Sequence, residues 1–164
     1  MHKFNQNPLL WMLLVAVSLV QFSCSSLRVS GKKPDQVKGL ITEARSYLGV
    51  PYKWGGLTRQ GLDCSGLVYR SFEKVGVVVP RTTEGLAEAG KRIKLKKVQP
   101  GDLLFFALSE KPGKVSHVGI VTEKKNGRMP VFIHASTSKG VVEADFGIKY
   151  YKEGFREARR VVAE

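Results

Sequence analysis

Two stretches in the first half of the chain repeat apolar residues at the spacing of an amphipathic helix. The first is predicted to cover residues 35–48, where Gly49 and Pro51 follow as stop signals. The second is predicted to begin at Asp63, a residue type that caps helices, and to end before Gly76. The apolar positions are Val37, Leu40, Ile41, Ala44 and Leu48 in the first stretch and Cys64, Val68, Phe72 and Val75 in the second.

After Pro100-Gly101 the chain changes to short apolar runs separated by turn residues, a pattern that predicts strands. Upstream of them, Lys91–Lys97 alternates basic and apolar residues as an edge strand does, and Thr83–Gly90 is predicted to form one or two helical turns. The strand runs are Asp102–Phe106, His117–Val121, Val131–Ala135, Val141–Phe146 and a short fifth at Val161–Val162. Helices followed by strands indicate an α+β domain, with N-terminal helices packed on a mainly antiparallel sheet of five to six strands.

Length and composition indicate the number of domains and the charge of the expected partners. The 164 residues have room for one domain, and 43% apolar with 25% charged residues is ordinary for a globular protein. The formal charge of +13 predicts attraction to polyanions, such as nucleic acid, anionic lipid headgroups or bacterial cell-wall polymers. No nucleic-acid-binding motif accompanies the charge, so we expect no nucleic-acid partner.

The first 24 residues have the pattern of an export signal. Leu9–Val20 is apolar except for Ser18, and twelve residues suit a signal-peptide core better than a membrane span. The following Gln21-Phe22-Ser23-Cys24 is similar to a bacterial lipoprotein signal, in which the cysteine becomes the lipidated first residue of the mature protein. Gln21 departs from that pattern, because an aliphatic residue usually stands there. A plain secretory signal and an uncleaved anchor are the alternatives.

These features divide the chain into three parts. We expect a signal peptide at residues 1–23, a lipidated N-terminus and polar tether at 24–34, and the folded domain at 35–164. The lipid, palmitate among its acyl chains, would be carried by Cys24 and hold the protein at a membrane. Exported chains of this kind belong to the cell envelope, and Ser25 after the cysteine is compatible with the outer membrane, facing the periplasm.

A thiol and two imidazoles are the chemistry that the domain offers. Cys64 would lie in the first turn of its helix, where free N–H groups and the helix dipole lower a thiol pKa. His117 begins one predicted strand and His134 ends the next, so an antiparallel hairpin brings the two together. Nucleophilic catalysis needs a thiol, a base and a group that orients the base.

Each of these residues also has a simpler interpretation. An isolated helical cysteine is more often a buried structural residue, and a strand histidine is more often a hydrogen-bonded one. Cys64, His117 and His134 could also ligate zinc, although only three ligands are present and no carboxylate stands at motif spacing to them. The three residues together favour a thiol enzyme that needs no metal or cofactor.

Six motifs in this order resemble the NlpC family of bacterial cell-wall cysteine peptidases, which have a reduced papain-like fold. They cover residues 49–136, and short lipoproteins are common in that family. The motifs are Gly49-Val50-Pro51-Tyr52-Lys53-Trp54-Gly55-Gly56, Asp63-Cys64-Ser65-Gly66-Leu67-Val68, Val79-Pro80-Arg81-Thr82-Thr83, Pro100-Gly101-Asp102-Leu103-Leu104-Phe105-Phe106, His117-Val118-Gly119-Ile120-Val121 and Phe132-Ile133-His134-Ala135-Ser136.

The resemblance implies a role for each matching residue. Cys64 would be the nucleophile, His117 the general base and later the acid, and His134 the residue that orients His117. Tyr52 would help to hold the oxyanion, unless it packs as a loop aromatic. The remaining candidates are substrate-binding residues: Asp63, Ser65, Trp54 and Arg81. Asp63 could instead only cap the helix, Trp54 could pack against the domain, and Arg81 could be a surface residue.

The resemblance further implies a cell-wall hydrolase that cleaves amide bonds in peptidoglycan stem peptides. The bond would be that between D-glutamate, through its γ-carboxyl, and the next diamino acid, or a peptide cross-link. The alternatives are a non-catalytic peptidoglycan-binding lipoprotein and an acyltransferase on the same fold. We expect peptidoglycan peptides and, through Cys24, a membrane as partners, and a monomer as the oligomeric state.

Overall fold

The computed structural model describes residues 33–108, 113–125 and 127–162, which belong to one domain. The expected signal peptide at 1–23, the lipidation site Cys24 and almost all of the tether lie outside the described residues. None of the helices in the described ranges has the length and apolar character needed to cross a membrane.

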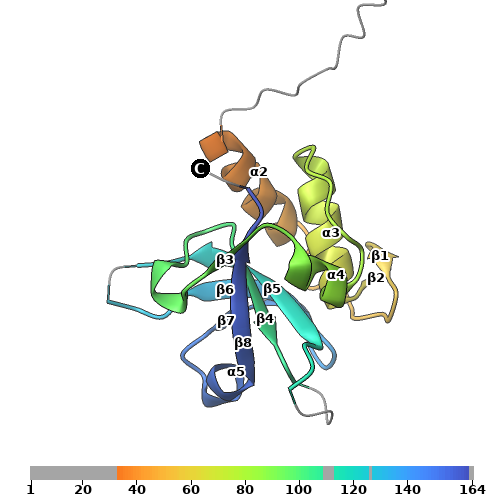
Figure 1. Cartoon of the computed structure of the whole chain (residues 1–164). Helices are drawn as coiled ribbons and strands as arrows, with labels where there is room; N and C mark the ends of the chain where they lie inside the picture. The colour runs from red at the N-terminus through yellow and green to blue at the C-terminus, as the bar shows by residue number, and fades with distance from the viewer. Residues whose placement is uncertain (1–32, 109–112, 126, 163–164) are drawn as a thin grey trace, which may run out of the picture. The chain divides into compact units, whose positions relative to one another are not determined.

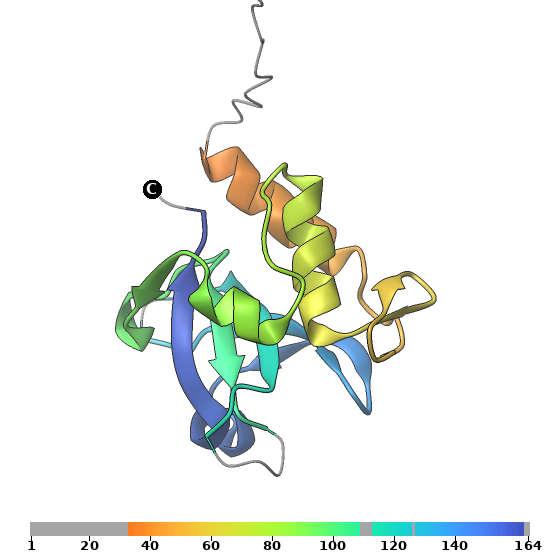
Figure 2. The same ribbon diagram turned by 45° about the vertical axis from the view of Figure 1, so that its right-hand side comes forward.

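Two helices lie side by side against one face of the sheet (Figures 1 and 2). They are α2 (Lys33–Arg45) and α3 (Cys64–Lys74), and both were predicted from apolar periodicity. The first ends three residues earlier than predicted, because residues 46–49 form a turn that leaves Leu48 half exposed. The shorter helices are α4 (Thr83–Glu88), the 3₁₀ turn η1 (Leu95–Lys97) and α5 (Lys149–Gly154).

The sheet has six strands in the order β3-β8-β4-β5-β6-β7, and every neighbouring pair is antiparallel. A separate two-stranded hairpin, β1 (Leu57–Thr58) and β2 (Gly61–Leu62), lies in the loop before α3. The strands of the main sheet are β3 (Lys91–Ile93), β4 (Leu103–Phe106), β5 (His117–Glu123), β6 (Val131–Ser136), β7 (Gly140–Asp145) and β8 (Phe155–Arg160).

The predicted α+β class with a five- to six-stranded antiparallel sheet is confirmed. Two predicted strands differ in position. The last strand is β8 rather than Val161–Val162, because no apolar run marks it in the sequence: its Glu157 forms ion pairs with Arg159 and with Arg92 of β3. The edge strand stops at Ile93, and the chain turns into η1 instead of continuing to Lys97.

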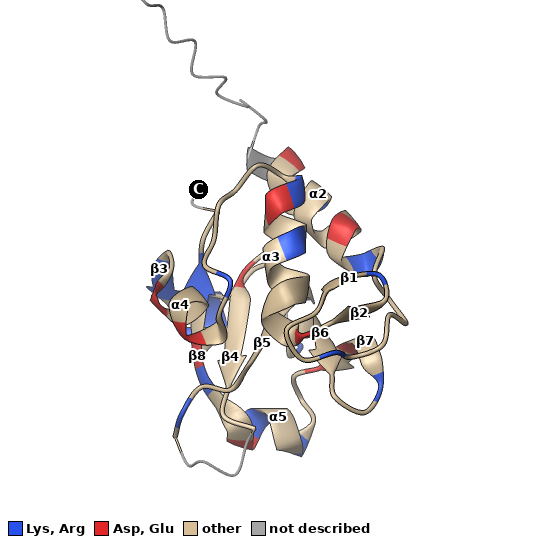
Figure 3. Cartoon of the chain, turned by 90° about the vertical axis from the view of Figure 1, so that its right-hand side faces the viewer, with Lys and Arg blue, Asp and Glu red and all other residues tan. Residues whose placement is uncertain are grey.

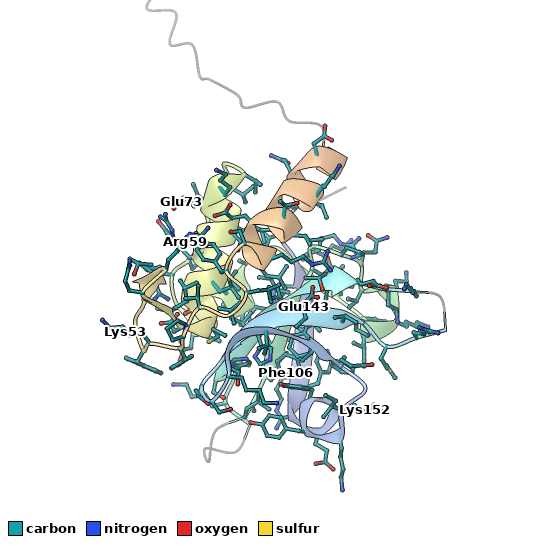
Figure 4. All side chains as sticks on the ribbon, turned by 180° about the vertical axis from the view of Figure 1, so that it is seen from behind. Lys53, Arg59, Glu73, Phe106, Glu143 and Lys152 are labelled. Atoms are coloured by element: carbon teal, nitrogen blue, oxygen red, sulfur yellow. The ribbon has the colours of Figure 1, made fainter. Side chains whose placement is uncertain are left out.

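Both faces of the sheet are buried, each by a different set of residues. Strand β4 shows this by alternation: Leu103 and Phe105 face the helices, whereas Leu104 and Phe106 pack on the opposite face. The opposite face carries a cluster of aromatic side chains, among them Phe106 and Phe132, against which Tyr151 of α5 packs. Figure 4 places Phe106 in the interior, while Lys53 and Lys152 point outward. The sheet is therefore a central layer of the domain.

Charge is distributed over the whole domain. Figure 3 shows lysines and arginines on α2, α3, α5, β3 and β8, with acidic residues between them. Arg160 at the end of β8 forms an ion pair with a buried carboxylate: it donates to both oxygens of Asp102, over 2.7 and 2.9 Å. The amide of Gln99 also donates to Asp102, over 2.8 Å. These bonds fix the turn before β4 to the last strand.

Replacing Asp102 by alanine is expected to lower the free energy of unfolding by about 3–5 kcal/mol, because the largely buried Arg160 would lose its ion pair with this carboxylate. Glu73→Gln is the matched control, since Glu73 pairs with Arg70 at the surface of α3 and should change stability by less than about 0.5 kcal/mol. Urea unfolding of the two variants measures the difference. Equal stabilities would contradict a structural role for this ion pair.

Candidate active site

Asp63 fixes the start of α3 and therefore the position of Cys64. Its carboxylate accepts a hydrogen bond from the Gly66 amide over 2.6 Å, which is the N-cap interaction, and from the Gly55 amide over 2.8 Å. A β-carbon on Gly66 would lie 2.2 Å from the Gly56 carbonyl oxygen, so only glycine allows the loop to approach the helix this closely. The Gly55-Gly56 loop is thereby held against the first turn.

Arg81 binds the same carboxylate from a third segment of the chain. Its two terminal nitrogens donate to the two oxygens of Asp63, over 3.0 and 2.9 Å. They also donate to Ser65 Oγ over 2.8 Å and to the Gly56 carbonyl over 3.2 Å. Arg81 was a candidate for substrate binding, with a surface position as the alternative, and in the structure its guanidinium pairs with Asp63.

The Cys64 side chain is buried at the first position of α3. Its Sγ lies 3.7 Å from Thr83 Oγ1 on α4. Burial raises the pKa of the Cys64 thiol, and hydrogen bonds from Thr83 and from the amides of Val118 and Ser65 offset only part of that effect. The expectation that the helix start lowers this pKa was therefore wrong in sign, because desolvation outweighs the helix-start amides. The hydrogen bond from the Val118 amide places the thiol beside the residue that follows His117.

The two histidines come together as the predicted strand order requires. His117 Nε2 and His134 Nδ1 lie 2.8 Å apart, with the rings nearly perpendicular at 86°. The β5–β6 register pairs Ile120 with Ile133, which puts His134 opposite Gly119 and diagonal to His117 on the same face. A β-carbon on Gly119 would lie 3.2 Å from His134 Cβ, so glycine leaves room for the imidazole.

Both imidazoles are uncharged at neutral pH. Burial, together with the neighbouring His134, lowers the pKa of His117 to about 3. Burial also lowers the pKa of His134 to about 4. Because Nε2 of His117 is engaged with His134, its Nδ1 is the nitrogen left to meet the thiol. The groove therefore holds a neutral thiol and, above about pH 4, two neutral imidazoles.

A tyrosine that the sequence analysis did not identify lies next to His134. Tyr151, on α5, has its hydroxyl 3.1 Å from His134 Nε2. Its ring packs edge-on against Phe132, with centroids 4.9 Å apart, and against Phe106, at 5.8 Å. The six-residue helix carries no apolar periodicity, and its residues 149–154 fall between two predicted strands. Nothing in the local sequence marks Tyr151.

These groups line one groove of about 740 Å³. The groove brings together every candidate residue proposed for the domain: Cys64, His117, His134, Tyr52, Asp63, Ser65, Trp54 and Arg81. Burial and the nearby Cys64 and Asp63 raise the pKa of Tyr52, so its hydroxyl remains a donor at neutral pH. Trp54 is 87% exposed, so its indole lies at the groove without packing into the core. Among the described residues, no group of three or more His, Cys, Asp or Glu side chains is arranged to hold a metal ion.

The sequence profile of the NlpC/P60 family matches residues 49–160, about two thirds of the chain. This chain belongs to the NlpC/P60 family. The match covers Cys64, His117, His134 and Tyr151, and it agrees with the resemblance drawn from the six motifs.

Individual proteins of the NlpC/P60 family are also similar to this chain in sequence and structure. The probable endopeptidase NlpC of Escherichia coli K12 is 37% identical over 126 residues, 76% of this chain and 78% of that protein. The murein DD-endopeptidase MepS/murein LD-carboxypeptidase of the same strain is 37% identical over 125 residues, 76% of this chain and 62% of that protein. The solved structure of the peptidoglycan hydrolase RipB from Mycobacterium tuberculosis superimposes with a TM-score of 0.69 at 25% identity, covering 93% of this chain and 79% of that one.

The expectation that this NlpC/P60 chain is a peptidase is confirmed by the family and by the peptidase names of its relatives. The role of each side chain stays a prediction. The geometry gathers the residues expected to act together, and it adds Thr83 and Tyr151 to them.

The buried neutral histidines predict a loss of stability in acid. Between about pH 6.5 and 4 the unfolded chain binds more protons than the folded one, because the folded-state pKa values of His117 and His134 lie near 3 and 4. The stability they contribute is complete above pH 6.5 and falls as pH drops, by up to about 1.4 kcal/mol per pH unit for each histidine.

Urea unfolding at a series of pH values measures this slope. His134→Gln should reduce it, whereas His2→Gln, in the predicted signal peptide, should leave it unchanged. An equal slope in the wild-type chain and His134→Gln would show that His134 is not buried in the neutral form.

Proposed function

We propose that this chain is a cell-wall hydrolase, a cysteine endopeptidase that cleaves amide bonds in peptidoglycan stem peptides. The observation that carries the proposal is that Cys64 and the hydrogen-bonded pair His117 and His134 line one groove. The names of its relatives support the substrate class, since MepS is named for murein and RipB for peptidoglycan. The same names support a place in the cell envelope.

The reaction begins with the Cys64 thiol and the free Nδ1 of His117. His117 takes the thiol proton as Sγ attacks the amide carbonyl, and His134 holds the imidazole that becomes charged. Tyr52 and the N–H groups at the start of α3 donate to the developing oxyanion. The protonated His117 then gives its proton to the departing amine, and Cys64 is left as a thioester. Water, activated by the same imidazole, releases the acyl product.

The raised pKa of Cys64 and the lowered pKa of His117 bear on the order of these events. Both groups rest in their neutral forms, so the proton transfer accompanies the attack and does not precede it. When substrate is in the groove, the negative charge develops on the oxygen of the attacked carbonyl.

The substrate-binding residues are proposed at one end of the groove. Asp63, Ser65 and Arg81 form a charged cluster in which the carboxylate is already bound by Arg81. An amine of the stem peptide would take one of the positions that Ser65 or Arg81 now holds. Trp54 offers an exposed aromatic face beside them. The bond cleaved is either the γ-D-glutamyl bond to the diamino acid or a peptide cross-link.

Cys64→Ala is expected to reduce the release of peptides from purified peptidoglycan by at least about 1,000-fold, because no other described thiol lines the groove. Glu73→Gln, on the surface of α3, is the folded control and should keep full activity. Mass spectrometry of the released muropeptides identifies the bond that is cut. Full activity in Cys64→Ala would overturn the mechanism.

The same assay separates the alternative functions. Hydrolysis yields new free amines and carboxylates, whereas an acyltransferase yields an acceptor joined to the acyl group. A non-catalytic binder would retain peptidoglycan in a pull-down, equally for the wild-type chain and for Cys64→Ala, and release nothing.

We further propose the division of the chain into a signal peptide at 1–23, a lipidated tether at 24–34 and the peptidase domain at 35–164. Labelled palmitate should be incorporated into the chain in cells, and Cys24→Ala should abolish the label. Cys64→Ala is the matched control and should retain it. A label that survives Cys24→Ala would refute lipidation at this residue.

A further inference from the structure

Tyr151 extends the histidine pair into a chain of three groups. From His117 Nε2 to His134 Nδ1 the distance is 2.8 Å, and from His134 Nε2 to the Tyr151 hydroxyl it is 3.1 Å. Both nitrogens of His134 are therefore engaged, one on each side. A neutral imidazole carries one N–H and one lone pair, so the two hydrogen bonds of His134 must run in the same direction along the chain.

Only two arrangements of the hydrogens satisfy these hydrogen bonds, and they differ in whether His117 Nδ1 carries a proton or a lone pair. If Tyr151 donates to His134 Nε2, then His134 Nδ1 donates to His117, and the proton of His117 stands on Nδ1, toward the thiol. If Tyr151 accepts from His134 Nε2–H, then His117 Nε2 donates to His134, and His117 Nδ1 carries a lone pair. Only the second arrangement lets His117 accept a proton from Cys64.

We propose that Tyr151 is a positioning residue that accepts the hydrogen bond of His134 Nε2–H and so keeps the lone pair of His117 directed at Cys64. The proposal rests on the proposed function, which makes His117 the base. The same direction also suits the charged intermediate, in which His117 holds two protons and donates one to His134. Tyr151 then needs no proton movement during the reaction.

The surroundings of Tyr151 suit an acceptor. Burial and the neighbouring Tyr150 raise the pKa of the Tyr151 phenol, so it stays neutral and its oxygen keeps lone pairs for His134. Its own O–H is free to turn to water, because Tyr151 lines the groove. The ring is held edge-on by Phe132 and Phe106, which fixes the oxygen at His134 without help from the hydroxyl. Removing the hydroxyl should therefore leave the ring in place.

Nitrogen-15 NMR of the histidine rings in the full-length chain reads the direction at neutral pH, because a protonated ring nitrogen resonates far from a bare one. Signals are assigned with His117→Gln and His134→Gln. The expected wild-type result is Nε2–H on both His117 and His134. A proton on Nδ1 of His134 would overturn the proposal, and this outcome is read on the wild-type chain once the signals are assigned.

Tyr151→Phe supplies the functional half of the test. We expect His134 to populate both tautomers and kcat for peptide release to fall about tenfold, with KM unchanged, as for other losses of an orienting hydrogen bond. Tyr69→Phe, which removes a hydroxyl from α3 outside the groove, is the matched control and should change neither measurement. Unchanged tautomers and kcat in Tyr151→Phe would refute the positioning role.

The two readouts separate this inference from the proposed function. If the wild-type chain shows the expected tautomers but releases no peptide from peptidoglycan, the proposed function fails and the hydrogen-bond direction stands. If the chain is active and Cys64→Ala is not, but His134 is protonated on Nδ1, the inference about Tyr151 fails alone.

Discussion

The carboxylate of Asp63 is the point on which the arrangement of the site depends. It receives hydrogen bonds from the amides of Gly55 and Gly66, from Ser65 and from both terminal nitrogens of Arg81. Those donors come from the glycine loop, the first turn of α3 and the segment before α4. A buried carboxylate is stable only when its lone pairs are used, so the three segments are held together by the cost of leaving it unpaired. Cys64, the next residue, takes its position from this junction.

Burial of the site and the helix start have opposite effects on the pKa of Cys64. Amides and the helix dipole favour a thiolate, but the buried position favours the neutral thiol, and the raised pKa shows that burial dominates. The same burial lowers the pKa values of His117 and His134, so the whole row of groups is neutral in the resting protein. Catalytic power in such a site has to come from the direction of hydrogen bonds and from donors placed for the transition state.

The sequence was sufficient for the features that local pattern controls. Apolar periodicity placed α3, and the antiparallel order of β5 and β6 placed His117 beside His134. It was not sufficient for features that depend on distant contacts. The partner of Arg81 is 18 residues away along the chain. The charged sequence of β8 is not recognisable as a strand until the acidic partners of its arginines are known. Tyr151 belongs to a short helix that only tertiary packing stabilises.

The number of donors at Asp63 also bears on whether this residue caps a helix or binds substrate. A carboxylate has about four lone-pair sites, and five donors already surround this one. The two amides cannot leave without undoing the helix start and the glycine loop, and Arg81 is bound through two nitrogens. Ser65 makes the longest of these bonds, at 3.2 Å, and its hydroxyl can rotate at little cost. If Asp63 binds a substrate amine, as we propose, the amine would reach it at the position of Ser65, and helix capping and substrate binding would use different lone pairs of one carboxylate.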